Sequence, residues 1–252
     1  MSGSRVKKNR RIQRNRSARI INAEKVSRSA EAVLSVDLSD VEFRNRTAQV
    51  VVGLCRAAFA QGKAIATLAT ADLLSAAAPN RRLVLEIALR LHWLQGLPAG
   101  DRRKAVDTML AKDRQGTNRL LDYLRDAGHE ADFDPTEMDA FDLDDVTSGA
   151  IHQQATRLNA AIGSTEIEPW SIYSMWLGET AFAHASANLA GKYAPTFDDL
   201  HLSSGVPDPM DPDLEAHHLI QTHIVMMTGW LLLDEGLPEE FSGRIGASFF
   251  DA

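Results

Sequence analysis

The chain contains 252 residues with a formal net charge of −7 at pH 7, and 44% of its residues are hydrophobic, as in ordinary globular proteins. Cys55 is the only cysteine, which excludes an intrachain disulfide and a cysteine-rich metal site. The charge is divided unevenly, because residues 1–34 hold ten Lys or Arg and two Glu while the remainder is strongly acidic. A basic segment attached to an acidic domain indicates two surfaces that suit different partners.

The sequence predicts a soluble, cytoplasmic protein with no membrane partner. Residues 1–34 lack the apolar core of a secretory signal, and no apolar run reaches the roughly 18 residues that a membrane-spanning helix needs. The longest runs are residues 64–78, which Asp72 interrupts, and residues 225–233. The Arg-rich, acid-poor start also resembles a mitochondrial transit peptide in composition, and that alternative stays open.

Residues 1–34 are predicted to form a disordered basic arm. Like charges and few apolar side chains prevent this segment from burying enough surface to offset the entropy of ordering. A nascent helix over residues 17–34 is the only regular structure expected there.

Residues 35–252 are predicted to form one all-α domain, a single bundle of about six or seven helices. Apolar residues at helical spacing define the helices, with Asp40 expected to cap the first and Gly62 to end it. The helices are expected at about residues 40–61, 63–78, 79–95, 101–127, 146–162, 169–190 and 213–234.

The segments between and after these helices have distinct compositions. Residues 126–145 form an acidic connector with nine Asp or Glu and no Lys or Arg. Residues 195–212 show little periodicity and are predicted to be a loop, and the residues from Gly236 onward are predicted to be a surface tail.

The helix at 79–95 carries the first candidate site. It is apolar nearly all round, which is typical of a buried helix, yet Arg82, Glu86 and Arg90 follow one another at i,i+4 spacing. Buried charges are tolerated when they are paired, so one interpretation is structural: an ionic network, or simply a partly exposed face of the helix. The other is an anion-binding site, because two Arg flank one Glu and leave a net positive charge.

The helix at 169–190 carries Tyr173 and His184 on one face. The two residues are too far apart along the helix to act on one atom, but each can contact the helix at 79–95 at a different level. A packing role and a role in a site are both consistent with this pattern.

No cofactor is predicted. The sequence lacks a phosphate-binding loop, a dinucleotide-binding glycine motif and a His-Glu-x-x-His motif. Glu215 and His218 have the spacing of half a di-iron site, but the second Glu-x-x-His is missing, so no metal ligands are assigned.

The segment Arg82-Leu-Val-Leu-Glu86-Ile-Ala-Leu-Arg90, followed by Leu-His-Trp-Leu, resembles a family of uncharacterised all-helical bacterial proteins. That family combines an Arg-x-x-x-Glu helix in its first half with a later helix that carries a Tyr and a His. Tyr173 and His184 would occupy the second element in this chain.

The resemblance covers residues 40–235 and leaves the basic arm outside. Family members often have a Ser shortly before the His, whereas this chain has Thr180. Because the family has no agreed activity, the resemblance implies a helical fold and no reaction. The site residues it implies are Arg82, Glu86, Tyr173 and His184.

The first functional hypothesis is a binding protein whose arm contacts nucleic acid or another polyanion. Basic residues alternate with polar spacers in the arm, a pattern typical of segments that contact phosphates through charge. No aromatic residue precedes Phe43, so base stacking by the arm is not expected. The candidate nucleic-acid contacts are Arg5, Lys7, Lys8, Arg10, Arg11, Arg14, Arg16 and Arg19. A solubilising role and a contact with the acidic connector are the alternatives for the arm.

The second hypothesis is an enzyme, such as a nuclease-like toxin or a defence protein, with its site inside the bundle. Arg82, Arg90 and Tyr173 would then bind the substrate, and Glu86 or His184 would transfer a proton. The sequence does not decide between binding and catalysis. The apolar run at 225–233 suits either a core or a contact between copies of the chain, so a homo-oligomer is a further open prediction.

Overall fold

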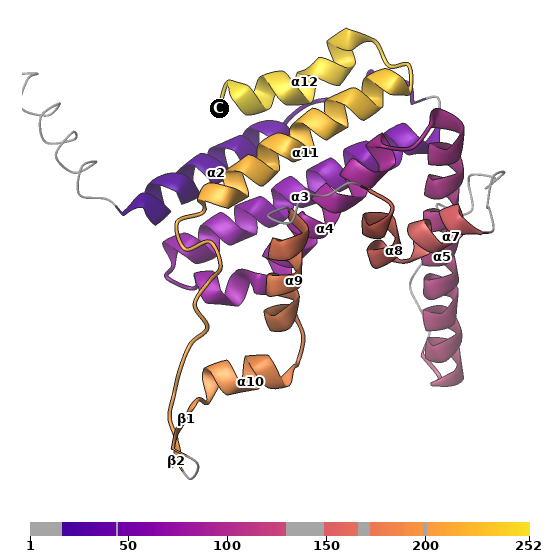
Figure 1. Cartoon of the computed structure of the whole chain (residues 1–252). Helices are drawn as coiled ribbons and strands as arrows, with labels where there is room; N and C mark the ends of the chain where they lie inside the picture. Colours follow the sequence, from indigo (N-terminus) through magenta and orange to yellow (C-terminus); the bar gives the residue numbers. More distant parts are fainter. Residues whose placement is uncertain (1–16, 44, 130–148, 166–171, 199–200) are drawn as a thin grey trace, which may run out of the picture.

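The computed structural model describes residues 17–43, 45–129, 149–165, 172–198 and 201–252. Within these ranges the chain forms ten α-helices, nine of them seven residues or longer, together with one short 3-10 helix and a two-stranded ribbon. The predicted all-α class is confirmed (Figure 1), whereas the number of helices exceeds the predicted six or seven.

Nearly all of the regular structure in the described residues is helical. The helices are α2 (Ala18–Leu34), α3 (Arg46–Thr70), η1 (Leu74–Ala77), α4 (Ala78–Gln95), α5 (Ala99–Asp126), α7 (Ala150–Thr156), α8 (Leu158–Gly163), α9 (Ile172–Ala183), α10 (Ala187–Tyr193), α11 (Glu215–Asp234) and α12 (Glu239–Phe250). The ribbon pairs β1 (Thr196–Asp198) with β2 (His201–Leu202) in antiparallel fashion.

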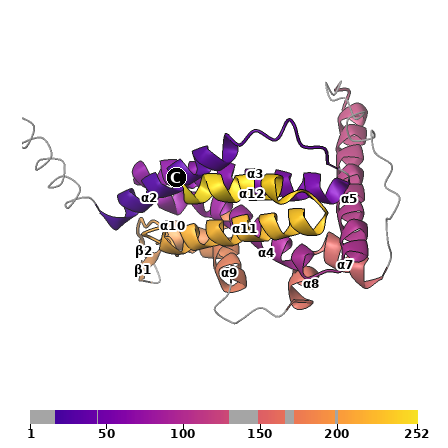
Figure 2. The same ribbon diagram turned by 90° about the horizontal axis from the view of Figure 1, so that it is seen from above.

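Helix α3 is the centre of the protein and packs against α2, α4, α5 and α11 (Figures 1 and 2). Val51, Cys55, Phe59 and Ile65 on α3 are fully buried. Among the described residues α3 is also the one helix long and apolar enough to cross a membrane, judged by length and composition only. A core helix passes the same test, so this property does not by itself indicate a membrane.

Residues 18–34 belong to the helical body, which corrects the prediction of a disordered arm as far as residue 34. Helix α2 packs along α3 and α12. Its buried face consists of four apolar residues at helical spacing, each 0–1% exposed: Ala23, Val26, Ala30 and Val33. The basic composition of the whole segment gave no sign of this apolar face. The disorder predicted for residues 1–16 lies outside the described residues.

Helix α3 begins later and ends later than predicted. Asn45, not Asp40, caps it by accepting a hydrogen bond from the Ala48 backbone nitrogen at 3.2 Å. Gly62 does not end the helix but lies within it, at a place where α11 approaches closely. The glycine is therefore explained by close packing and not by a helix end.

Two predicted helices are each divided in two. Arg157 has an extended backbone and separates α7 from α8. Residues 184–186 separate α9 from α10, and Ser186 caps α10 by accepting a hydrogen bond from the Leu189 backbone nitrogen at 3.1 Å. The helices predicted at 79–95, 101–127 and 213–234 are confirmed as α4, α5 and α11.

The residues from Gly236 onward are not a surface tail, as predicted, but contain helix α12. This helix packs on α11 and α2. Ser242, Ile245 and Phe249 lie on its buried face, at spacings of three and four residues. The ring of Phe249 meets that of Phe59 on α3 edge to face at 5.7 Å.

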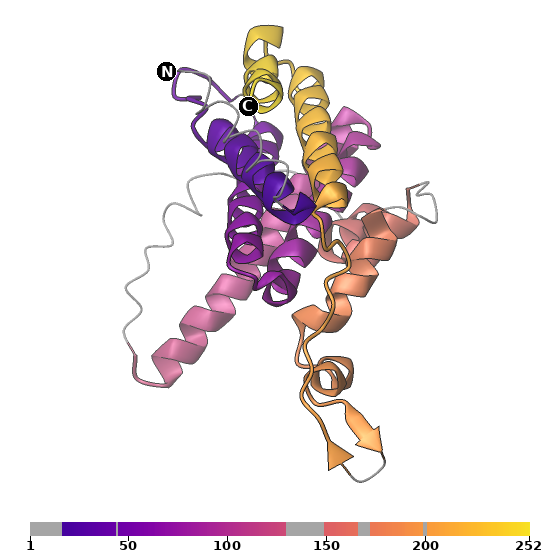
Figure 3. The ribbon, with the colours of Figure 1, turned by 90° about the vertical axis from the view of Figure 1, so that its left-hand side faces the viewer.

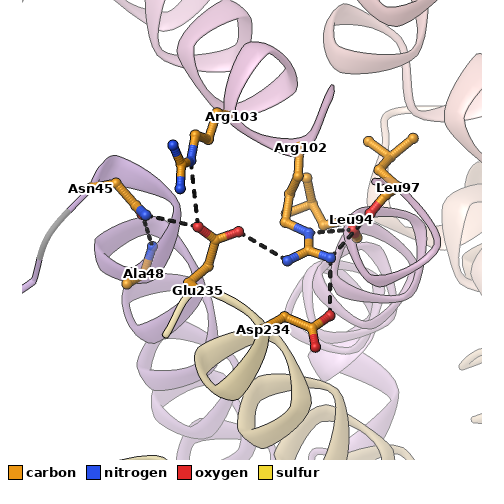
Figure 4. Close-up of polar contacts among 8 residues, drawn as sticks. All are labelled: Asn45, Ala48, Leu94, Leu97, Arg102, Arg103, Asp234 and Glu235. Atoms are coloured by element: carbon orange, nitrogen blue, oxygen red, sulfur yellow. Dashed lines mark hydrogen bonds and ion pairs between the residues drawn. The ribbon is translucent and has the colours of Figure 1, made fainter. Parts of the chain in front are cut away.

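Helix α5 crosses one end of the body (Figure 2), and Arg102 near its start is the main polar attachment. The Arg102 side chain is 3% exposed and donates hydrogen bonds to the backbone oxygens of Leu94 and Leu97, both at 3.0 Å (Figure 4). It also contacts the carboxylates of Asp234 at 3.1 Å and Glu235 at 2.9 Å. One arginine thus ties α5 to the ends of α4 and α11.

Glu235 receives two further donors, Asn45 at the start of α3 and Arg103 of α5 (Figure 4). Asn45, at the start of α3, donates a hydrogen bond to its carboxylate at 2.7 Å, and Arg103 approaches it at 3.8 Å. The Glu235 side chain is fully buried, so these partners compensate the cost of removing its charge from water.

The segment from α9 to the ribbon extends away from the other helices (Figures 1 and 3). The start of this segment is tied to the body, because α9 packs on α4. Most of the acidic connector predicted at 126–145 lies outside the described residues.

Candidate functional site

The predicted Arg82–Glu86 pair lies on the partly exposed face of α4. The two side chains are 27% and 30% exposed, and their charged groups are 3.7 Å apart. Arg82 also donates a hydrogen bond to the Thr180 hydroxyl at 3.3 Å and lies over the Trp176 ring, 5.5 Å from its centroid. Arg82 thus helps to hold α9 against α4.

Arg90 binds the end of α7. Its guanidinium donates hydrogen bonds to the backbone oxygens of Gln154 at 3.0 Å and Ala155 at 3.1 Å, where the last turn of a helix leaves carbonyls unpaired. Burial lowers the pKa of Arg90, and the charges of Glu86 and Asp113 oppose that lowering. Lys112 donates to the Thr156 backbone oxygen in the same turn.

A half-open pocket of about 220 Å³ lies beside Glu86 and Arg90, between α3, α4, α5 and α7. It is large enough for a few water molecules or a small polar group. Its two cationic side chains already bind the end of α7, which leaves less capacity for an anion than two free guanidinium or ammonium groups would offer. The lining residues are Leu54, Leu83, Glu86, Ile87, Arg90, Met109, Lys112, Asp113 and Ala155.

Tyr173 and His184 do not join this pocket. Tyr173, near the start of α9, is partly buried, and its ring stacks on that of Trp176 at 5.9 Å. His184 follows the last residue of α9, is exposed and therefore does not share a helical face with Tyr173. No hydrogen bond or ion pair of the described residues joins His184 to Glu86, so the two candidate proton-transfer groups are not brought together.

A buried ion pair that sequence reasoning missed lies one residue before Arg82. Arg81 is 5% exposed and contacts Glu179 of α9 through two hydrogen bonds, at 2.6 and 3.1 Å. A third N–H of Arg81 donates to the Leu74 backbone oxygen. No spacing rule connects Arg81 with Glu179, so the sequence carried no signal for this pair.

Two further buried polar side chains, His217 and Gln221, lie on successive turns of α11. They are 3% and 1% exposed. The His217 Nε2 atom and both polar atoms of the Gln221 amide have no hydrogen-bond partner among the described residues. Both side chains meet α3 at Gly62, where an added Cβ would lie 2.7 Å from the Gln221 nitrogen and 3.4 Å from His217 Nε2.

His217 is uncharged at neutral pH. Burial lowers the pKa of His217 to about 4, and the positive charges of Arg81 and His218 add to the lowering. The combination of Arg81, Glu179, His217 and Gln221 is therefore a buried polar centre in which one ion pair is satisfied and two neutral groups are not.

The described residues contain no group of three or more His, Cys, Asp or Glu side chains that could hold a metal ion. His218, considered with Glu215 for a di-iron half-site, stacks on the Phe249 ring at 5.6 Å. Burial raises the pKa of the Cys55 thiol to about 11, which keeps it protonated and unsuited to nucleophilic attack.

The predicted nucleic-acid contacts fall into two groups. Arg19 lies on α2 and forms an ion pair with Asp72 at 2.7 Å. The others precede residue 17 and lie outside the described residues: Arg5, Lys7, Lys8, Arg10, Arg11, Arg14 and Arg16.

The apolar run at 225–233 contributes to both the core and the surface. Val225 and Leu231 are buried, whereas Met226, Trp230 and Leu233 are between 42% and 46% exposed. The run is therefore partly core, and the homo-oligomer stays a prediction.

No family model matches the chain, and no curated protein or solved structure shows significant similarity to it. The resemblance carried by the Arg82–Glu86 segment accordingly stays a prediction.

Proposed function

We propose that this protein is a binding protein in which residues 1–16 contact a polyanion, with nucleic acid as the first candidate. The observation that carries the proposal is the charge of this segment. Residues 1–16 contain seven Lys or Arg and no acidic residue, whereas the whole chain has a net charge of −7. The helical body alone repels a polyanion, so attraction falls to the segment that precedes it.

Helix α2 connects the basic segment to the helical body. It starts at Ala18 and is packed on α3 and α12, so the basic segment is attached to a firmly held helix. Two other basic residues of the segment 1–34, Lys25 and Arg28, are exposed on α2 itself. They provide an internal comparison, because they are basic and accessible but belong to the body.

The binding should be electrostatic and largely independent of base sequence. Phosphate contacts by Arg and Lys release counterions, so the logarithm of the binding constant falls linearly with the logarithm of salt concentration. If all seven Lys and Arg side chains contact phosphates, the expected slope of log binding constant against log salt concentration is about −6 on duplex DNA and about −5 on single strands. No aromatic residue precedes Phe43, which leaves base stacking without a source in this segment.

The enzyme alternative draws less support from the geometry. Arg82 contacts Glu86 and Thr180, and Arg90 binds the end of α7. His184 is exposed and makes no hydrogen bond or ion pair with Glu86 among the described residues, so the two candidate proton-transfer groups do not lie at one site.

The test is a gel-shift titration of labelled RNA and duplex DNA across a salt series. The full chain is compared with a chain that lacks residues 1–16, since removal of residues 1–34 would also remove α2. We expect a salt-dependent shift that disappears with the shorter chain.

A matched pair of double variants locates the contacts. R10Q/R11Q should reduce the salt slope by about 2 on duplex DNA, and K25Q/R28Q should leave it unchanged. Absence of any shift at low salt, or an equal effect of the two variants, would contradict the proposal. Shortened RNA in the same gel would favour the enzyme alternative.

A further inference from the structure

Two histidines from different helices lie next to each other at the contact between α4 and α11. The ring centroids of His92 and His223 are 5.6 Å apart, and their planes are inclined by 38°. Both side chains are partly buried, and the helices that carry them pack directly against each other. The pair lies outside the polar centre formed by Arg81, Glu179, His217 and Gln221.

Each ring of this pair has one nitrogen with no partner. The Nδ1 atom of His92 and the Nε2 atom of His223 are closed off from solvent and make no hydrogen bond within the described part of the chain. Buried polar atoms nearly always have a partner, and an exception calls for a water molecule, an ion or another ligand. The two exceptions here are imidazole nitrogens, which are the commonest metal ligands in proteins.

The protonation state of the pair suits a cation. Burial lowers the pKa of both imidazoles, and the neighbouring His92 adds to the lowering at His223. Both rings are thus neutral at pH 7, with one lone pair each available for coordination. Protons therefore compete with a metal ion less than they do at an exposed histidine.

The separation of the rings fits a shared ion. A zinc ion lies about 2.0–2.1 Å from a ligating nitrogen, hence roughly 3.2 Å from the centroid of the ring. Two rings on one ion can then have centroids up to roughly 6.4 Å apart, and the tetrahedral ligand angle gives about 5.2 Å. The observed 5.6 Å lies within this range.

We propose that His92 and His223 form a two-histidine site for a late first-row divalent metal ion, Zn²⁺ or Cu²⁺, that joins α4 to α11. Imidazole nitrogen suits both ions. Because the described residues supply no third His, Cys, Asp or Glu to any such group, water completes the coordination. With two protein ligands, the site should bind the ion more weakly than a four-ligand structural zinc site does. The site is independent of polyanion binding by residues 1–16.

The test is isothermal titration of untagged, metal-free full chain with ZnCl₂ and with CuCl₂ at pH 7. The ring-preserving variants H92F and H223F keep the packing between α4 and α11 and remove the ligating nitrogens. His129, which is exposed after the end of α5, provides the matched control H129F. Circular dichroism and thermal melting establish that each variant is folded before titration.

We expect one equivalent of metal to bind the wild-type chain and the H129F control. Either phenylalanine variant should weaken binding at least tenfold. Copper electron paramagnetic resonance should show two coordinated imidazole nitrogens in the wild type and at most one in each phenylalanine variant. Zinc should also raise the melting temperature of the wild type but not of H92F or H223F, since the ion links two helices of the native state.

Three results would overturn the site: no binding to the wild type at millimolar metal, unchanged affinity in both phenylalanine variants, or loss of affinity in only one of them. Loss of affinity in only one variant would show that a single histidine binds the metal ion and that the ion is not shared.

Discussion

Arg81 of α4 and Glu179 of α9 form a doubly hydrogen-bonded ion pair in the protein interior, although they lie 98 positions apart in the chain. The neighbouring residue Arg82 forms only a longer, partly exposed contact with Glu86. One helix thus carries two Arg–Glu pairs of different character. The first is buried and crosses between helices, and the second lies within one helix near the surface.

These two pairs should respond differently to neutralisation. E179Q leaves the Arg81 charge buried without its counterion and is expected to reduce the free energy of unfolding by about 3–5 kcal/mol. E86Q removes a contact of a partly exposed i,i+4 pair and should cost less than about 1 kcal/mol. Urea unfolding followed by circular dichroism measures both.

The double variant R81M/E179L is the control for charge burial. Replacing both members by apolar residues should recover much of the loss, because no buried charge remains. A cost of E86Q equal to that of E179Q would contradict this difference and show that the Arg82–Glu86 pair contributes as much to stability as the buried pair.

These two pairs show which features of the fold could be predicted from the sequence and which could not. Helical periodicity identified α4, α5 and α11, because apolar spacing depends on local geometry alone. Arg81 and Arg82 differ by one position and hence by about 100° around the helix, and only the packing of α9 decides which of them is buried. Spacing along one helix pointed to Arg82, since Glu86 lies four residues away.

Helix α12 was missed for a related reason. Gly243 and Gly246 within it lower the intrinsic helix propensity, so the segment resembles a tail. Contacts with α11 and α2 supply the stability that the local sequence lacks. Likewise, the total charge of residues 1–34 concealed the buried face of α2.

The two glycines Gly53 and Gly62 within α3 should respond in opposite ways to alanine. An added Cβ at Gly62 would lie 2.7 Å from the end of the buried Gln221 side chain, which would have to shift, so G62A should destabilise by about 1–3 kcal/mol. At Gly53 nothing lies within 4 Å, and G53A should stabilise by about 0.5–1 kcal/mol through helix propensity. Chemical unfolding of the two variants, side by side, provides the comparison. A stabilising G62A would mean that α3 and α11 are less closely packed at this point.

The lowered pKa of His217 predicts that the protein loses stability in weak acid. Its pKa falls from 6.5 to about 4 on folding, so between these values the unfolded chain binds a proton that the native chain does not. The stability contributed by the neutral ring is fully present above pH 6.5 and decreases as the pH falls toward 4, with a slope of at most about 1.4 kcal/mol per pH unit. The total change is on the order of 3 kcal/mol.

The variant H217Q isolates this effect. His92, His218 and His223 also have lowered pKa values and contribute with the same sign, so the difference between the wild-type and H217Q profiles is the relevant quantity. Urea unfolding at half-unit steps from pH 7.5 to 4.5 should give a shallower slope for H217Q. Parallel profiles would contradict the assignment of a buried neutral His217.

The carboxylates of Asp234 and Glu235 offer a second matched comparison. Glu235 is fully buried and accepts from Arg102 and Asn45, whereas the Asp234 side chain is 53% exposed and forms an ion pair with Arg102. E235Q should lower the free energy of unfolding by about 2–4 kcal/mol. D234N should cost less than about 1 kcal/mol, because water can replace the carboxylate. Similar losses of unfolding free energy in E235Q and D234N would contradict this expectation. They would show that α5 is held mainly by the hydrogen bonds from Arg102 to backbone oxygens.

The boundary of the helical body can be located by two deletions. A chain lacking residues 1–16 should keep its melting temperature, because the buried face of α2 begins at Ala23. A chain lacking residues 1–34 loses four buried apolar side chains and uncovers α3 and α12. At roughly 1–3 kcal/mol per large apolar side chain, somewhat less for alanine, this loss is comparable with the whole stability of a typical domain.

Point variants of α2 test the same boundary without removing any residue. V26D places a charge on a side chain that is fully buried against the body and should cost more than about 3 kcal/mol. K25D introduces the same group at the neighbouring, exposed position and should change stability by less than about 0.5 kcal/mol. Thermal melting followed by circular dichroism measures both variants and both deletions. If V26D melts like K25D, and the chain without residues 1–34 melts like the full chain, then residues 18–34 belong functionally to the basic segment and not to the body.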